Sequence, residues 1–122
     1  MRSSGWDYLE HMIEDCEDIL EALRMVSDEN DFVTNRFVHK SVLYSLLNLG
    51  ELMKSFTKSE RDLVPQIPWK NIIGFRDRAA HGYHHLNLPI VWSIINTHIG
   101  PLLLELQKQK QSPMEINSPQ QP

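Results

Sequence analysis

The sequence contains a single cysteine in 122 residues, Cys16, so it cannot form an internal disulfide. Chains without disulfides are typical of reducing compartments. Cys16 falls within an apolar stripe at helical spacing, which predicts a buried position rather than a nucleophile. No apolar run approaches the roughly 20 residues that a membrane-spanning helix needs, and residues 1–6 lack the apolar core of a secretion signal. We therefore expect a cytoplasmic protein without a membrane partner.

Positive charge is also scarce, because 12 lysines and arginines face 16 aspartates and glutamates, which leaves a formal net charge of -4. This balance argues against a protein that coats nucleic acid nonspecifically. It does not exclude a local basic cleft, since electrostatic fields act locally. The length suffices for one domain with a single core. We place that helical domain at residues 1–110 and expect the Gln-, Ser- and Pro-rich residues 111–122 to be disordered.

The sequence has no convincing stretch of alternating polar and apolar residues, so strands are not expected. Apolar residues recur at helical spacing over residues 6–26, 35–56, 68–81 and 88–108. These segments predict an all-α, up-down four-helix bundle with loops at residues 27–33 and 57–67. Pro101 lacks a backbone N–H and is expected to bend the last helix near residues 97–100. The apolar faces are wide for a chain of this size, which favours a homodimer.

One charged residue lies on an apolar face. On a helical wheel, Arg76 falls near the middle of the arc formed by the apolar residues of the third predicted helix. A guanidinium is always charged, so on such a face it needs either a carboxylate partner or an anion bound in a cleft. Glu51 is a candidate partner, although its polar helix edge, shared with Tyr44 and Asn48, equally fits a solvated face. Gly50, in the middle of a helix, indicates close approach of another helix or of backbone.

A short motif carries a family resemblance. Arg76, His81 and Tyr83 stand in the pattern Arg-x4-His-x-Tyr, with a polar residue, Asp77, directly after the arginine. A Pro-Trp pair precedes the motif helix, and a Gly-Glu pair lies in the second predicted helix. On these residues the chain resembles the HepT-like branch of the HEPN superfamily, a group of small all-helical domains. The resemblance spans residues 8–106.

The resemblance implies the toxin of a toxin–antitoxin pair, acting as a metal-independent endoribonuclease without a cofactor. It also implies a partner, a small nucleotidyltransferase antitoxin of the MNT type, which transfers AMP to the motif tyrosine and so blocks the nuclease. Carried over to this sequence, Arg76 and His81 are the catalytic residues and Tyr83 is the adenylylated residue. Asp77 and Glu51 would support them.

Cleavage of RNA suits these side chains. RNA supplies its own nucleophile, the 2′-OH, so the protein needs a group that moves protons near pH 7 and a cation at the phosphate. Histidine, with an ordinary pKa of about 6.5, serves as acid or base, and the arginine fork matches phosphate oxygens. We therefore expect His81 to move protons while Arg76 holds the scissile phosphate. Lys70 and Arg78 share the polar arc with His81, and they either guide the RNA backbone or are ordinary solvated charges.

The spacing raises a geometric difficulty, because Arg76 and His81 point roughly 140° apart on a straight helix. Either the helix ends at His81 and Gly82 redirects the chain, or the site is built across a two-fold dimer. The dimer also explains an arginine on an apolar arc, and we favour it.

Other interpretations stay open at this stage. One is a non-catalytic nucleotide- or partner-binding helical module associated with a nucleotidyltransferase. Another is a structural helical dimer in which Arg76 and Glu51 form a buried pair. No metal site is expected, because the adjacent His84 and His85 point in different directions. The loop to which they belong departs from the usual pattern of the family.

Overall fold

The computed structural model describes residues 4–82 and 86–111 of the chain. Within these ranges every regular element is a helix. In chain order the elements are η1 (Gly5–Tyr8), α1 (Leu9–Leu23), α2 (Glu29–Thr34), α3 (Arg36–Met53), α4 (Lys58–Leu63), α5 (Trp69–Ala79), α6 (Leu88–Ile94), η3 (Ile95–Ile99) and α7 (Gly100–Gln111). The predicted all-α class is confirmed. The predicted disordered tail lies outside the described residues, except for Gln111, which ends α7.

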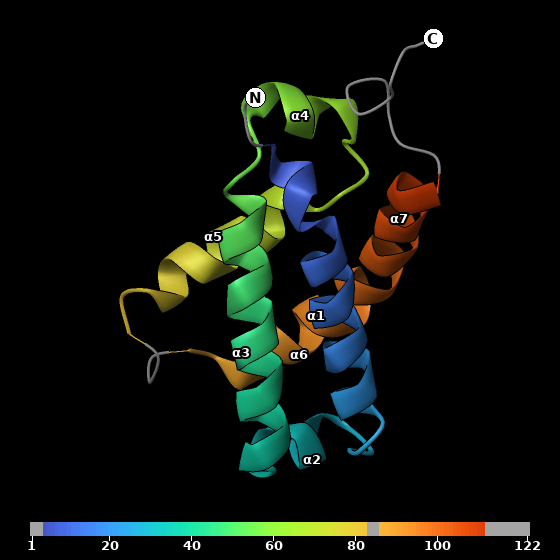
Figure 1. Cartoon of the computed structure of the whole chain (residues 1–122). Helices are drawn as coiled ribbons and strands as arrows, with labels where there is room; N and C mark the ends of the chain where they lie inside the picture. Colours follow the sequence, from blue (N-terminus) through green and yellow to red (C-terminus); the bar gives the residue numbers. More distant parts are fainter. Residues whose placement is uncertain (1–3, 83–85, 112–122) are drawn as a thin grey trace, which may run out of the picture.

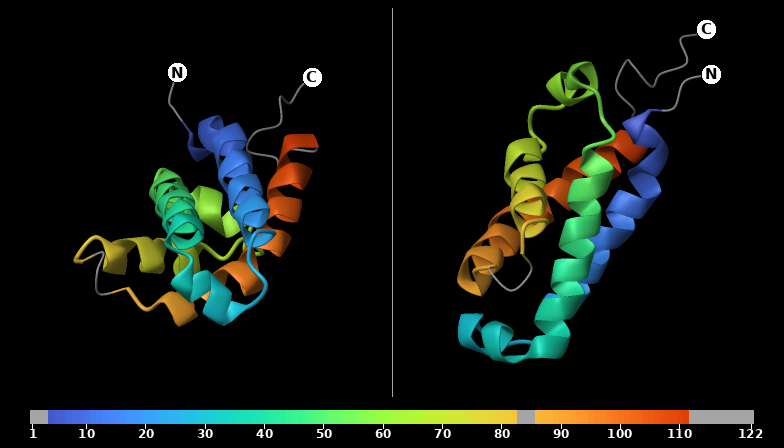
Figure 2. Two further views of the ribbon diagram at one scale, coloured as in Figure 1. Left: turned by 90° about the horizontal axis from the view of Figure 1, so that it is seen from below. Right: turned by 90° about the vertical axis from the view of Figure 1, so that its left-hand side faces the viewer.

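The two longest helices, α1 and α3, lie side by side at the centre of a helical bundle (Figure 1). α5 packs against α3, while η3 and α7 pack against α1. The two views of Figure 2 place α5 on the side of α3 that faces away from α1. Part of the surface of α5 is therefore open to solvent.

The apolar stripes of the long helices form the core. Fully or almost fully buried are Met12, Cys16 and Ile19 from α1, and Val42, Leu43, Leu46, Leu49 and Met53 from α3. Removing these side chains from water is the main force that holds the helices together. The predicted core position of Cys16 is confirmed, and burial raises the pKa of its thiol to about 12.

The segments predicted as loops, residues 27–33 and 57–67, each contain a short helix, so this part of the prediction was wrong. α2 begins after Asp28, whose carboxylate accepts a hydrogen bond from a backbone N–H of the first turn at 2.8 Å. α4 begins after Thr57, which forms a capping box with Glu60. N-cap side chains bind the otherwise unpaired N–H groups of a first turn. A polar segment can thus become helical without an apolar stripe.

The last predicted helix is interrupted. The π-helical turn η3 (Ile95–Ile99) separates α6 from α7 immediately before Gly100 and Pro101. Pro101 has no N–H to donate to the carbonyl of Thr97, and a π turn is a common way to accommodate such a defect. The irregularity therefore lies where the bend was predicted.

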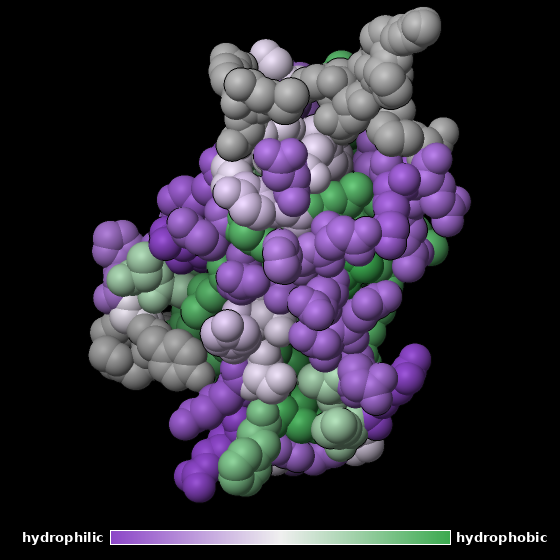
Figure 3. All heavy atoms as spheres, viewed as in Figure 1, coloured by the Kyte–Doolittle hydropathy of each residue, from purple (hydrophilic) through white to green (hydrophobic). Residues whose placement is uncertain are grey.

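The described surface is largely hydrophilic on the face shown in Figure 3. Apolar side chains gather at the lower end of that face, around the end of α1 and the start of α3, where Met25 and Phe37 are exposed. In the described part of the chain, no helix combines the length and the apolar character that crossing a membrane requires.

Candidate functional site

A close contact between α3 and α5 positions the motif arginine. A Cβ atom added at Gly50 would lie 2.6 Å from the Cβ of Arg76 and 3.1 Å from the carbonyl oxygen of Ile72. Only glycine allows α5 to approach α3 this closely without displacement. The predicted close approach at Gly50 is confirmed, and it places Arg76 beside the last turn of α3.

Arg76 bridges two carboxylates. Its Nη2 lies 2.8 Å from Oε1 of Glu51, and its Nη1 lies 3.4 Å from Oδ1 of Asp77. The predicted pairing with Glu51 is confirmed, but the pair is not buried, because the side chains of Arg76 and Glu51 are 30% and 58% exposed. Lys54 donates a hydrogen bond to Oδ1 of Asp77 at 2.9 Å. This bond, with a smaller contribution from Arg76, lowers the pKa of Asp77 below its ordinary value.

Arg76 forms one wall of a pocket of about 310 Å³. The other lining residues are Tyr44, Leu47, Asn48 and Glu51 from α3 and Ala79 and Ala80 from the end of α5. The polar edge predicted on the second helix therefore faces the motif arginine. The guanidinium is held in place by carboxylates and still faces a space that could admit an anion.

A buried carboxyl group lies directly behind this pocket. Asp15 on α1 is only 6% exposed, and its Oδ2 accepts a hydrogen bond from Nδ2 of Asn48 at 2.7 Å. Burial raises the pKa of Asp15 to about 6, although the bond from Asn48 partly opposes this effect. The sequence did not identify this residue as buried. The excess of acids on α1 gave no signal that distinguished Asp15 from the others.

His81 does not join Arg76 in the pocket. Its backbone N–H donates to the carbonyl of Arg78, and that of Gly82 donates to Ala79, so the chain continues as a tight turn through Gly82. The His81 side chain is exposed and is not among the residues that line the pocket. The turn at Gly82 thus leaves His81 outside the pocket that Arg76 lines. Tyr83 lies outside the described residues, as do His84 and His85.

The two other predicted cations lie on the outer surface of α5. Lys70 and Arg78 are both exposed. If Gly74 carried a Cβ atom, its nearest neighbour would be Nη1 of Arg78 at 3.5 Å. The guanidinium of Arg78 thus lies over Gly74. Its positive charge is therefore about one helical turn closer to Lys70 than the Cα atom of Arg78 is.

Comparison with known proteins connects the chain to a ribonuclease family. The model of a family described as "Ribonuclease HepT-like" matches residues 10–109. The chain is 36% identical over 102 residues to "Putative RNase TTE0752" of Caldanaerobacter subterraneus subsp. tengcongensis, which covers 84% of this chain and 87% of that protein. It is 30% identical over 108 residues to "Probable ribonuclease HepT" of Thermococcus cleftensis, which covers 88% of this chain and 97% of the relative. No matching solved structure was found.

Proposed function

The chain belongs to the HepT-like ribonuclease family, and from that premise we propose that it is the toxin of a toxin–antitoxin pair that cleaves RNA internally without a metal ion. The observation that carries the proposal is the placement of Arg76. Its guanidinium is held by Glu51 and Asp77 and is still partly exposed in a pocket. A cation fixed in advance stabilises developing phosphate charge without having to reorganise during the reaction.

In the proposed reaction, the 2′-OH of one nucleotide attacks the adjacent phosphorus while its proton passes to a base. A bond forms between the 2′ oxygen and phosphorus, and the bond from phosphorus to the 5′ oxygen of the next nucleotide breaks. The leaving oxygen takes up a proton. His81 moves these protons, and Arg76 stabilises the negative charge on the phosphate oxygens. The products are a 2′,3′-cyclic phosphate and a 5′-hydroxyl.

A two-fold dimer would bring the two side chains together. Within one protomer Arg76 faces the pocket on α3, whereas His81 lies exposed beyond the end of α5. One face of α3 carries two exposed aromatic side chains: Tyr44, which lines the pocket, is 73% exposed, and Phe37, at the start of the helix, is 80% exposed. A second copy packed on this face would cover those rings, and we propose that its His81 then lies near Arg76 of the first copy.

The reaction is tested by a chemical change in the RNA substrate rather than by a mutation in the protein. The purified protein is expected to cleave RNA in the presence of a metal chelator and to leave 2′,3′-cyclic phosphate ends. An oligonucleotide with 2′-deoxyribose at the cleavage position should resist, because it lacks the attacking hydroxyl. Product ends are identified by mass spectrometry. Equal cleavage of the deoxy-substituted strand contradicts the mechanism, and a folded protein that leaves all RNA intact favours the non-catalytic binding module.

Adenylylation of Tyr83 is the second part of the proposal. We propose that an MNT-type nucleotidyltransferase transfers AMP from ATP to the phenolic oxygen of Tyr83, with pyrophosphate as the leaving group. A phosphodiester three residues after Ala80 adds negative charge and bulk close to His81, which would oppose the approach of RNA. We also propose that the protein is cytoplasmic, where it would have access to cellular RNA.

The Tyr83→Phe variant should accept no AMP when it is incubated with such a nucleotidyltransferase and ATP, because it lacks the acceptor oxygen. Incorporation is measured by the mass of the intact protein. Tyr44→Phe, which removes an exposed phenol on α3, is the matched control and should be modified as heavily as the wild type. Equal incorporation into the Tyr83 variant would place the modification elsewhere.

A further inference from the structure

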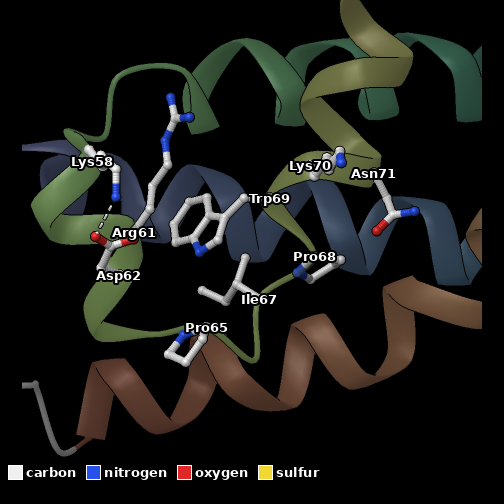
Figure 4. A pocket seen from close by; sticks show the side chains of 9 residues that line it. All are labelled: Lys58, Arg61, Asp62, Pro65, Ile67, Pro68, Trp69, Lys70 and Asn71. Atoms are coloured by element: carbon white, nitrogen blue, oxygen red, sulfur yellow. Dashed lines mark hydrogen bonds and ion pairs between the residues drawn. The ribbon is translucent and has the colours of Figure 1, made fainter.

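An open groove of about 830 Å³ lies between α4 and the first turn of α5 (Figure 4). Its charged lining consists of three cations, Lys58, Arg61 and Lys70, and one carboxylate, Asp62. In a chain with a formal net charge of -4, this groove has a local excess of positive charge. Such an excess draws anions from solution because the field depends on nearby charges rather than on the total.

Two of the three cations have no counter-charge in the described part of the chain. Lys58 is paired with Asp62 at 2.8 Å, whereas neither Arg61 nor Lys70 makes an ion pair with a described residue. The Nε of Arg61 is shielded from solvent and has no hydrogen-bond acceptor among the described residues. An unpaired buried donor is costly. A phosphate oxygen in the groove would supply an acceptor and a negative charge to the terminal N–H groups of the same guanidinium.

The wall between these cations is rigid. The indole N–H of Trp69 donates to the carbonyl of Val64 at 3.0 Å, and its ring packs against Phe56 with centroids 4.8 Å apart. Figure 4 shows Arg61 on one side of Trp69 and Lys70 on the other. α5 begins at this point without a side-chain cap, so the positive end of its dipole adds to the charge of the side chains.

Positive side chains on α5 lead from the groove toward the proposed catalytic histidine. Lys70, Gly74 and Arg78 follow one another at intervals of four residues, which places them on one face of α5, and His81 follows Arg78 in the turn after the helix. Lys70 and Arg78 are about 12 Å apart along the axis of α5, at about 1.5 Å per residue. The guanidinium of Arg78, which lies over Gly74, carries positive charge across the middle of this distance.

We propose that the groove between α4 and α5 binds the phosphodiester backbone of single-stranded RNA outside the cleavage site, with Arg61 and Lys70 contacting phosphates. The strand then follows the outer face of α5 past Arg78 to His81. This inference rests on the proposed function in taking RNA as the ligand, and it adds a site, centred on Arg61, at a distance from the reacting phosphate.

The test compares the salt dependence of binding for two doubly substituted proteins. The probe is a fluorescent 2′-O-methyl oligouridylate of about 12 nucleotides, a length within the range of single-strand binding sites. For the Arg61→Gln, Lys70→Gln protein, the slope of log K against log salt should be shallower than that of the wild type by about 1.4, which is about 0.7 for each lost phosphate contact. Binding is measured by fluorescence anisotropy.

The matched control is the Arg36→Gln, Lys40→Gln protein, which removes the same charge from exposed positions at the opposite end of α3 (Figure 1). Its slope should equal that of the wild type. Equal changes of slope in both proteins would overturn the proposal, because they would reflect net charge alone. If the Arg61 substitution prevents folding, Lys70→Gln is compared with Lys40→Gln, and a difference of about 0.7 is expected.

This measurement is independent of the cleavage chemistry. The probe has no free 2′-OH, so its binding is unaffected if Arg76 and His81 are not the catalytic pair. If the wild type leaves unmodified RNA intact, the result counts against the proposed function. It does not affect the proposal that the groove binds RNA. Conversely, active cleavage combined with equal slopes for the two proteins would overturn the groove alone.

Discussion

A mixture of Arg76→Ala and His81→Ala protomers is expected to recover RNA cleavage that neither variant has alone. The reason is that His81 does not line the pocket that Arg76 lines, so the proposed site takes these two side chains from different protomers. If each site takes Arg76 from one copy and His81 from the other, a mixed dimer contains one site in which both side chains are intact. The other site in that dimer lacks both.

The expected changes are large. His81→Ala alone should lower the rate by about 10²- to 10⁴-fold, the usual contribution of a positioned acid or base. Arg76→Ala should lower it by about 10²- to 10³-fold, as for other lost oxyanion donors. In an equal mixture with random exchange, half of the dimers are mixed and each has one working site, so about a quarter of the wild-type rate should return.

Subunit exchange has to be demonstrated in the same samples, by mass spectrometry of the intact dimers. Each variant mixed with itself is the control and should stay inactive. If the subunits exchange but RNA cleavage does not recover, then either both side chains of a site come from one protomer or one of them is not catalytic. A monomeric protein with full activity would also contradict the shared site.

The helices that could be predicted from the sequence are those whose burial leaves a periodic pattern. α1, α3 and α5 bury long apolar stripes, and the period alone placed each of them within a few residues. α2 and α4 are too short to show an apolar stripe, because α2 buries only Phe32 and α4 only Glu60, so their polar sequences resemble loops. What stabilises them is local capping, by Asp28 in α2 and by Thr57 with Glu60 in α4. Capping boxes of this kind are visible in a sequence, and they were overlooked here.

The parts of the site that could be predicted are those that depend on residue spacing within a single helix. Tyr44, Asn48 and Glu51 share an edge of α3 by spacing alone, and Gly50 indicated that a second helix comes close. The environment of Asp15 depends on what α3 places opposite α1, which no period within α1 encodes. The cationic groove likewise combines α4, which was predicted as a loop, with the start of α5. Both features arise from contacts between elements rather than from a pattern within one.

The stability of the fold should depend on pH through Asp15. Burial raises the pKa of this carboxyl from 3.8 to about 6. Between about pH 4 and pH 6 the folded chain keeps a proton that the unfolded chain has released, so stability falls as pH rises through this window. Above about pH 6 both states are ionised and the loss is constant. A shift of this size corresponds to about 3 kcal/mol at most, at about 1.4 kcal/mol per pKa unit.

Asp15→Asn should therefore stabilise the protein by about 1–3 kcal/mol near pH 8 and change its stability much less near pH 4, where the folded wild-type carboxyl is neutral and that of the unfolded chain is only about half ionised. The amide oxygen can still accept the hydrogen bond from Asn48, while its new N–H₂ group needs an acceptor, and this requirement limits the gain. The measurement is urea unfolding of wild type and variant at both pH values. Glu17→Gln, which neutralises an exposed carboxylate on the same helix that does not act on Asp15, is the control and should show no comparable difference between the two pH values. A gain for Asp15→Asn that is the same at both pH values would mean that the buried carboxyl does not titrate in this window, and the burial of Asp15 behind the Arg76 pocket would then carry no electrostatic cost.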